Sequence, residues 1–132
     1  MRKIIFLLAL FTISGPYAQE GQELVVTQIV TCTEVEAREP VGVNTVFPDT
    51  VGTLYCYTEI KGALTPTKVK HIWYHLDEER AAIELDVKSE TWRTWSSKRI
   101  IPQWAGKWRI DVVDAKGDVL TSHDFTIEST TF

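Results

Sequence analysis

The sequence predicts an all-β fold, an antiparallel β-sandwich of about seven strands with immunoglobulin-like or fibronectin-like connections. Apolar and polar residues alternate with a period of two in several short segments, as strands with one buried face require. Turn residues separate these segments, and no apolar pattern with the 3.6-residue period of an amphipathic helix follows residue 18. Short strands without helices between them favour a sandwich or a small barrel.

The first 18 residues are expected to be a secretory signal peptide. Two basic residues at positions 2 and 3 precede an apolar run, Ile4–Ile13, and small Ala18 stands before polar Gln19. The run is too short to cross a hydrocarbon layer of about 30 Å. We therefore expect an exported protein, periplasmic or extracellular, with one β-sandwich domain over residues 19–132 and no transmembrane segment in the mature chain.

The first two expected strands flank a long irregular connection. Leu24–Val35 is rich in valine, isoleucine and threonine, which suit a pleated surface. Glu36–Asp49 contains two prolines and a glycine and is expected to be irregular. Thr53–Lys61 alternates along its whole length, so that Cys56 and Ile60 share one face.

Three further strands are expected in the middle of the chain. Val69–Leu76 is separated by the acidic turn Asp77–Glu79 from Ala81–Lys88, in which isoleucine, leucine and valine occupy alternate positions. Thr91–Ile101 is expected to remain extended until Pro102 ends it, because proline cannot donate a ladder hydrogen bond.

The last two strands are expected to form a β-hairpin. Lys107–Asp114 places Trp108 on the same face as an isoleucine and a valine, and Val119–Glu128 carries a phenylalanine and an isoleucine on one face. The turn between them contains Gly117, which can adopt a positive φ at little cost.

Two cysteines, Cys32 and Cys56, are expected to form a disulfide in an exported protein. The bridge would close a loop of about 25 residues and stabilise the fold by roughly 3 kcal/mol. The alternative is a pair of buried free thiols.

The overall charge argues against nucleic acid as a partner. Removal of residues 1–18 leaves 12 basic residues against 18 acidic ones, a formal net charge of −6. A chain of this balance repels phosphate backbones. Charge is nevertheless unevenly distributed, since Lys88–Arg109 holds six cations and one acid while Asp77–Asp86 holds five acids and one cation.

The segment Trp92–Arg99 is the strongest candidate for a binding surface, with two tryptophans and three cations. Strand periodicity sends Trp92 and Trp95 to opposite faces, so they cannot form one flat platform. One of them is expected in the core and the other under an arginine near the surface, whereas Trp73 and Trp108 are expected in the core. The candidate contact residues are Arg93, Trp95, Lys98, Arg99 and, beyond Pro102, Trp104.

An anionic polymer, a glycan or an envelope protein would suit this basic segment, although it could equally pair with the domain's own acids. A carbohydrate-binding module that uses exposed tryptophans is an alternative function. A periplasmic enzyme is another, but no serine, cysteine or carboxylate lies in a recognisable catalytic pattern. His71 and His75 would lie about 13 Å apart on a strand, too far to share an ion. We expect no catalytic residues, no metal and no cofactor.

Several motifs together resemble a bacterial family, catalogued as domain of unknown function 2914. They are Arg38–Gly42, Leu54–Ile60, His71–Tyr74, Trp92–Arg99 and Gly106–Asp114. The resemblance covers nearly the whole mature chain and implies an extracytoplasmic or membrane-associated β-domain, but no reaction. One departure follows the His-x-Trp-Tyr strand, where relatives often have a glycine and this chain has Asp77-Glu78-Glu79-Arg80.

Overall fold

The computed structural model describes residues 22–130, so the predicted signal peptide lies outside the described part. Three strands have only three residues each: β2 (Glu34–Glu36), β3 (Glu39–Val41) and β4 (Val46–Pro48). The longer strands are β1 (Val25–Cys32), β5 (Thr53–Lys61), β6 (Thr67–His75), β7 (Glu78–Val87), β8 (Thr91–Arg99), β9 (Gly106–Asp114) and β10 (Val119–Glu128).

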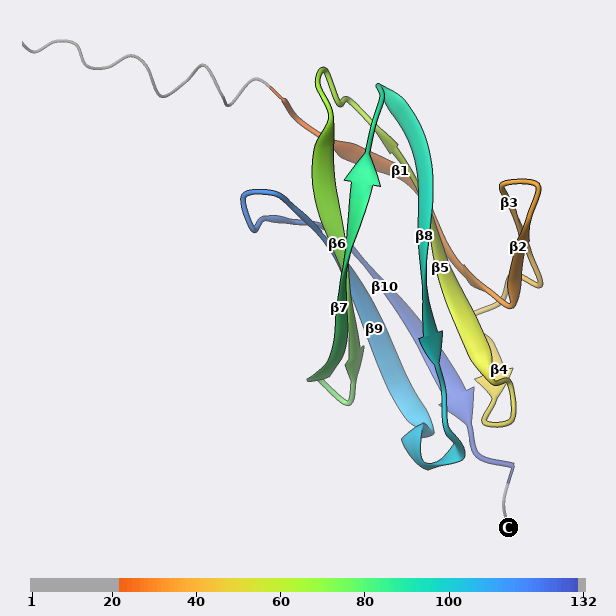
Figure 1. The fold of residues 1–132 in the computed structure, drawn as a ribbon. Helices are drawn as coiled ribbons and strands as arrows, with labels where there is room; N and C mark the ends of the chain where they lie inside the picture. The colour runs from red at the N-terminus through yellow and green to blue at the C-terminus, as the bar shows by residue number, and fades with distance from the viewer. Residues whose placement is uncertain (1–21, 131–132) are drawn as a thin grey trace, which may run out of the picture.

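The long strands form the two layers of a β-sandwich, which confirms the predicted fold class (Figure 1). One sheet has three strands in the order β1-β5-β8, and the other has five in the order β4-β10-β9-β6-β7. Neighbouring strands are antiparallel except for β4, which runs parallel to β10. The predicted hairpin of the last two strands is present as β9 and β10. In residues 22–130, no helix is long and apolar enough to cross a membrane.

The core lies between the two sheets and contains the largest rings of the chain. Trp73 on β6 and Trp108 on β9 are almost completely buried, as predicted, and both pack against Phe125 of β10. Leu54 and Cys56 of β5 reach the same cluster from the opposite sheet. Alternation along these strands therefore places one apolar face of each sheet against the other.

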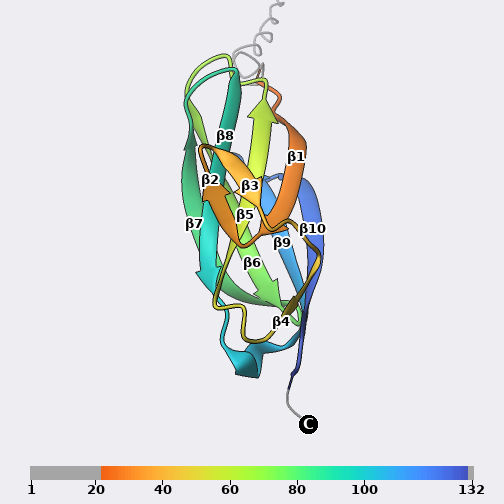
Figure 2. The same ribbon diagram turned by 90° about the vertical axis from the view of Figure 1, so that its right-hand side faces the viewer.

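Residues 36–49 are more ordered than the sequence predicts. The short strands β2 and β3 form a hairpin that lies across the outer face of the three-stranded sheet (Figure 2). Its turn consists of Ala37 and Arg38, both with positive φ, a conformation for which glycine or asparagine is the usual signal. The absence of that signal is why the hairpin is not visible in the sequence.

The chain after this hairpin joins the two sheets along one side of the sandwich. The Asn44 N–H donates to the Thr31 carbonyl of β1 at 3.1 Å, and the Thr31 hydroxyl donates to the Asn44 carbonyl at 2.6 Å. One residue later, the Thr45 carbonyl accepts the Thr126 N–H of β10 at 2.9 Å. The segment then continues as β4, so this side of the sandwich is closed.

The predicted disulfide is not formed, because Cys32 and Cys56 are free and buried. Cys32 lies opposite Tyr55 and Cys56 lies opposite Thr31, so the two cysteines are on adjacent strands but point to opposite faces of the sheet. Cys56 belongs to the core, whereas Cys32 lies under the β2–β3 hairpin beside the backbone of Val41. Burial raises the pKa of both thiols, which makes them unreactive.

We expect reductant to have no effect on stability. Thermal unfolding followed by circular dichroism with and without dithiothreitol should give the same Tm. A bridge worth about 3 kcal/mol would instead make Tm fall by roughly 10 °C or more on reduction. A thiol count of the denatured protein without reductant should find both cysteines free, and a count of zero would contradict the register of β1 and β5.

Candidate functional site

The predicted binding segment is strand β8, one edge of the three-stranded sheet. Its register with β5 pairs Trp92 with Ile60 and Trp95 with Tyr57. Trp92 therefore points inward and Trp95 points outward, which confirms the prediction that they lie on opposite faces. Arg93 and Arg99 share the outer face with Trp95, whereas Lys98 does not.

The exposure of the tryptophans limits what they can bind. Trp73 and Trp108 are core residues, and Trp92, Trp95 and Trp104 are half-buried. Trp92 packs against the apolar cluster around Val112, and Trp95 stacks on Tyr57 with ring centroids 5.8 Å apart and planes at 13°. All five tryptophans of the chain are thus buried or half-buried.

The tip of the β2–β3 hairpin is fastened to the outer face of this sheet. The Arg38 carbonyl accepts the Tyr57 hydroxyl at 2.6 Å and an Arg93 N–H at 3.3 Å. Ala37 and Arg38 have φ values of 50° and 63°, an arrangement that costs about 1–2 kcal/mol per residue without glycine. These two hydrogen bonds hold the strained turn in place, and such turns are often found at ligand clamps.

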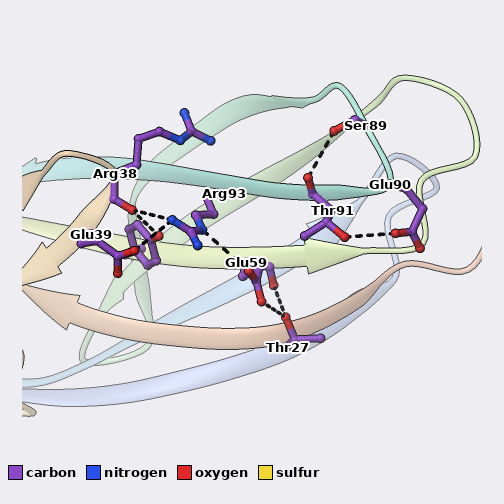
Figure 3. Close-up of polar contacts among 9 residues, drawn as sticks. Thr27, Arg38, Glu39, Glu59, Ser89, Glu90, Thr91 and Arg93 are labelled. Atoms are coloured by element: carbon purple, nitrogen blue, oxygen red, sulfur yellow. Dashed lines mark hydrogen bonds and ion pairs between the residues drawn. The ribbon is translucent and has the colours of Figure 1, made fainter.

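Arg93 holds the hairpin by its charge as well. Its guanidinium contacts Glu39 of β3 at 3.0 Å and Glu59 of β5 at 3.7 Å. The Thr27 hydroxyl in turn donates to Glu59 at 2.8 Å. Figure 3 shows this chain of contacts crossing from β8 to β1. The predicted contact residue Arg93 is therefore neutralised by two carboxylates of the domain itself.

The Arg38 side chain points away from these contacts (Figure 3). Its guanidinium carbon lies 5.7 Å from the ring centre of Trp92 and 5.9 Å from that of Trp95. A cleft of about 280 Å³ opens here at the edge of β8, lined by Arg38, Asp86 and residues 92–95. We call this place the Arg38 cleft. Among residues 22–130, no carboxylate forms an ion pair with Arg38, whereas Asp86 is paired with Lys68 at 2.6 Å.

A second group of cations surrounds Trp104, which ends the 3-10 helix η3 (Pro102–Trp104). Lys98 Nζ lies 4.5 Å from the ring centre of Trp104, and the guanidinium carbon of Arg80 lies 5.2 Å from the same ring centre. Burial, and then the nearby Arg80 charge, lower the pKa of Lys98. Arg80 is paired with Glu78 at 3.1 Å, but Lys98 has no carboxylate partner in the described chain. We call this place the Trp104 site.

The predicted contact residues therefore divide among three places. Arg93 and Trp95 border the Arg38 cleft, Lys98 and Trp104 form the Trp104 site, and Arg99 is exposed on the outer face without either ring beside it. The central residue of the cleft, Arg38, was not among the predicted contacts. Its only signal was its place in the Arg38–Gly42 motif, within a stretch expected to be irregular.

A serine and a histidine do approach each other as in a catalytic pair, but inside the core. Ser96 Oγ lies 2.7 Å from His71 Nδ1, and the residues are 4% and 0% exposed. Trp73 Nε1–H donates to Ser96 at 3.1 Å, and His71 Nε2 lies 3.3 Å from the Thr58 hydroxyl. Thr58 donates to the Thr94 carbonyl at 2.8 Å.

The direction of this chain of hydrogen bonds follows from its ends. Because the only hydrogen of the Thr58 hydroxyl goes to a carbonyl, His71 Nε2–H must donate to Thr58. The neutral ring then has a bare Nδ1, which accepts from Ser96, and Ser96 accepts from the indole of Trp73. With His71 neutral, each of these side chains has a partner for its hydrogen bond. Burial lowers the pKa of His71 to about 4. These four side chains link β5 and β8 of one sheet to β6 of the other, so their role is structural.

Histidines and acids do not gather elsewhere as ion ligands. In residues 22–130, no group of three or more histidine, cysteine, aspartate or glutamate side chains is placed to hold a metal ion. His71 and His75 are both buried, and each is bonded inside the domain, His75 through its Nε2 to the Ala105 carbonyl at 2.8 Å. The Arg38 cleft and the Trp104 site instead bring cations close to tryptophan rings.

Comparison with known families supports the resemblance in the part of the chain that contains the motifs His71–Tyr74, Trp92–Arg99 and Gly106–Asp114, and it does not reach the two earlier motifs. The family model described as Protein of unknown function (DUF2914) matches residues 66–127. Residues 66–127 belong to the DUF2914 family. The match covers β6 to β10, including the whole of β8, and it brings no assigned activity to this chain. A comparison with curated proteins found no match.

Parts of two solved structures are similar to most of this chain. The beta-glucosidase from Kluyveromyces marxianus has a TM-score of 0.47 at 12% identity, over 81% of this chain and 14% of that chain. The GH3 beta-glucosidase from Bifidobacterium adolescentis has a TM-score of 0.44 at 8% identity, over 80% of this chain and 17% of that chain. The chain thus spans less than a fifth of either enzyme, and these likenesses carry nothing about its function.

Proposed function

We propose that this protein is a non-catalytic, extracytoplasmic binding module that contacts an anionic partner through the Arg38 cleft. One observation carries the proposal: a guanidinium without a carboxylate partner lies over two half-buried tryptophan rings beside a cleft. Arginine and tryptophan are the residue types that dominate binding energy at interfaces. A cation that is held over aromatic rings and partly shielded from water attracts an anion more strongly than a fully solvated cation does.

The ion pairs among residues 22–130 do not include this arginine. Several other cations already have carboxylate partners, namely Lys68, Arg80, Arg93 and Arg109. The strained turn at Ala37 and Arg38 supports the same conclusion, because two hydrogen bonds maintain an unfavourable backbone that brings this guanidinium to the rings.

The alternative of a carbohydrate-binding platform has less support from the geometry. A sugar stacks on a flat, open ring face, but Trp95 is stacked on Tyr57 and has the Arg38 guanidinium over its ring. Trp92 packs against the core. A cationic cleft between half-buried rings suits an acidic group better than a neutral sugar.

The enzyme alternative is not supported by the one serine–histidine pair described above, because that pair is not accessible to a substrate. Ser96 and His71 are enclosed, and their hydrogen bonds are used within the core. We therefore assign them no catalytic role in this proposal.

The proposal is tested by reversing the charge of Arg38. We expect Arg38→Glu to weaken binding of an anionic probe about ten-fold or more, since it places like charges together. The probes are polygalacturonate, polyglutamate and neutral dextran, followed by tryptophan fluorescence at constant salt. Near-ultraviolet circular dichroism checks that the variant keeps its packing.

The matched control is Arg99→Glu, which makes the same charge change about 20 Å further along the strand than Arg93. Equal weakening by both variants would mean that net charge alone attracts the probe, and the cleft would lose its role. Binding of dextran that does not depend on Arg38 would support the carbohydrate-binding alternative instead.

A further inference from the structure

We propose that the free edge of β8 accepts an extended acidic segment of a partner protein as an additional strand. This inference rests on the proposed function, because it names the partner class for the Arg38 cleft. It adds the Trp104 site as a second contact for the same segment. The added strand would extend the three-stranded sheet.

The first argument is the state of the edge. Within residues 22–130, β8 pairs with β5 and has no strand on its other side. An edge strand leaves a row of backbone N–H and C=O groups without partners in the sheet. The nine pairs between Thr53–Lys61 and Thr91–Arg99 run without a register shift, whereas the pairs β1–β5, β9–β10 and β6–β7 each contain one.

This edge is protected from aggregation by charge and not by its length, a bulge or a proline. Edges are normally kept short or broken by a bulge or a proline, and β8 has nine residues with neither. The edge carries cations instead. A regular, cationic edge excludes other copies of itself and remains open to a strand of opposite charge.

The second argument is the position of the two cation–ring sites. The Arg38 cleft lies at residues 92–95 of β8, and the Trp104 site includes Lys98. Six residues of extended chain, from 92 to 98, span about 20 Å. A single extended segment with acids towards both of its ends would therefore reach both sites.

The Trp104 site has the electrostatics of an anion site. Lys98 and Arg80 share one ring, and burial followed by repulsion from Arg80 lowers the pKa of Lys98. Lys98 is half-buried and has no carboxylate of its own. A carboxylate brought by a partner would relieve the repulsion of the two cations.

The third argument distinguishes a polypeptide from a glycan. The backbone groups of an edge strand are spaced to pair with another strand, and strand addition derives its affinity from these main-chain hydrogen bonds. A polysaccharide has no amide groups at this regular spacing. A second copy of β8 is unsuitable because it would bring Lys98 and Arg99 against the same two cations.

The test uses a fluorescein-labelled peptide of about nine residues, with two glutamates at each end and alternating threonine and valine between them. A control peptide replaces the central valines with prolines, which keep the charge but cannot form the ladder. Another control replaces the glutamates with glutamines. Binding is measured by fluorescence anisotropy, with polygalacturonate as an anionic competitor without a peptide backbone.

The protein variants are Arg38→Glu and Lys98→Glu, and the matched control is Lys70→Glu on the outer face of the other sheet. We expect Arg38→Glu and Lys98→Glu each to weaken binding of the glutamate peptide about ten-fold or more. The control should leave the affinity for this peptide unchanged. The proline and glutamine peptides should bind at least about ten-fold more weakly to the unaltered protein. Hydrogen exchange should show new protection in the amides of residues 92–98.

The outcomes separate this inference from the proposed function. Equal binding of the glutamate and proline peptides, with loss in Arg38→Glu, would overturn strand addition and leave the Arg38 cleft as an anion site. Full displacement of the peptide by polygalacturonate at equal charge concentration would do the same and indicate an anionic glycan. New protection on β1 instead of β8 would overturn the choice of edge. No binding of any anionic probe would overturn both proposals.

Discussion

Replacing Ser96 with alanine is expected to lower the free energy of unfolding by about 3 kcal/mol. The change leaves two buried groups without partners, the indole N–H of Trp73 and the bare Nδ1 of His71. Each unsatisfied buried group costs about 1–3 kcal/mol. Urea denaturation near pH 7.5, followed by tryptophan fluorescence, would show a lower midpoint with an unchanged slope.

The neighbouring serine provides the matched control. Ser97 is exposed on the opposite face of β8, so Ser97→Ala should change the free energy of unfolding by less than about 0.5 kcal/mol. Similar losses in both variants would contradict the assignment of Ser96 to the core network. Both variants keep the two cysteines, and dithiothreitol in both samples holds the thiols reduced when urea exposes them.

Stability is also expected to fall steeply in mild acid because of His71. Burial lowers its pKa from 6.5 to about 4, so the unfolded chain binds a proton that the folded chain does not. The stabilisation is fully present above pH 6.5 and is lost as the pH falls towards 4. The difference between these pKa values corresponds to about 3 kcal/mol. Urea midpoints measured from pH 7.5 to pH 4.5 would record the loss.

Two comparisons isolate the contribution of His71. Burial also lowers the pKa of the half-buried His123, so His123→Gln should keep most of the pH dependence while His71→Gln should lose most of it. Should His71→Gln fail to fold, the ring carbon protons of His71 in the unaltered protein can be followed by NMR. A titration of this ring with a midpoint near 6.5 would contradict the enclosed, neutral histidine.

Periodicity predicted the elements in which one face is buried. The predicted strand Thr53–Lys61 has the same bounds as β5, and Val119–Glu128 has those of β10. The opposite faces of Trp92 and Trp95 and the core positions of Trp73 and Trp108 follow from the same alternation. Information within a single strand is sufficient for such statements, because side chains alternate strictly along it.

Relations between strands could not be read in this way. The free state of Cys32 and Cys56 depends on the register of β1 against β5, which includes a bulge between Val26 and Gln28. A shift of one residue exchanges the two faces of a strand, and the sequence of β1 carries no local mark of its register. The disulfide therefore seemed reasonable from spacing and chemistry alone.

The turn after the His-x-Trp-Tyr strand shows a similar limit. Glycine is absent there, yet Leu76 and Asp77 adopt positive φ values of 51° and 67° and keep the turn tight. Arg109 contacts Asp77 at 2.7 Å, and the Leu76 N–H donates to the Lys107 carbonyl at 3.0 Å. These contacts from β9 hold a conformation that local preference disfavours.

The sequence predicted the strand of the candidate site but not its central cation, because contacts between distant strands are again involved. The concentration of rings and cations in Trp92–Arg99 marked the correct strand, but net charge does not show which cation is already paired. Arg93 is neutralised by acids from two other strands, and the guanidinium that lies over the rings comes from Arg38 on a separate hairpin. Pairing of distant charges is a property of the folded chain.

The closed side of the sandwich sets the stoichiometry of any strand addition. Asn44 and Thr45 bind both sheets there, and β4 covers β10 and ends in Pro48, whose nitrogen has no hydrogen to donate. Strand pairing is therefore blocked at the ends of β1 and β10 that meet there. A partner segment added at β8 would form a complex of one to one, because the segment pairs with β8 and not with this side of a second molecule.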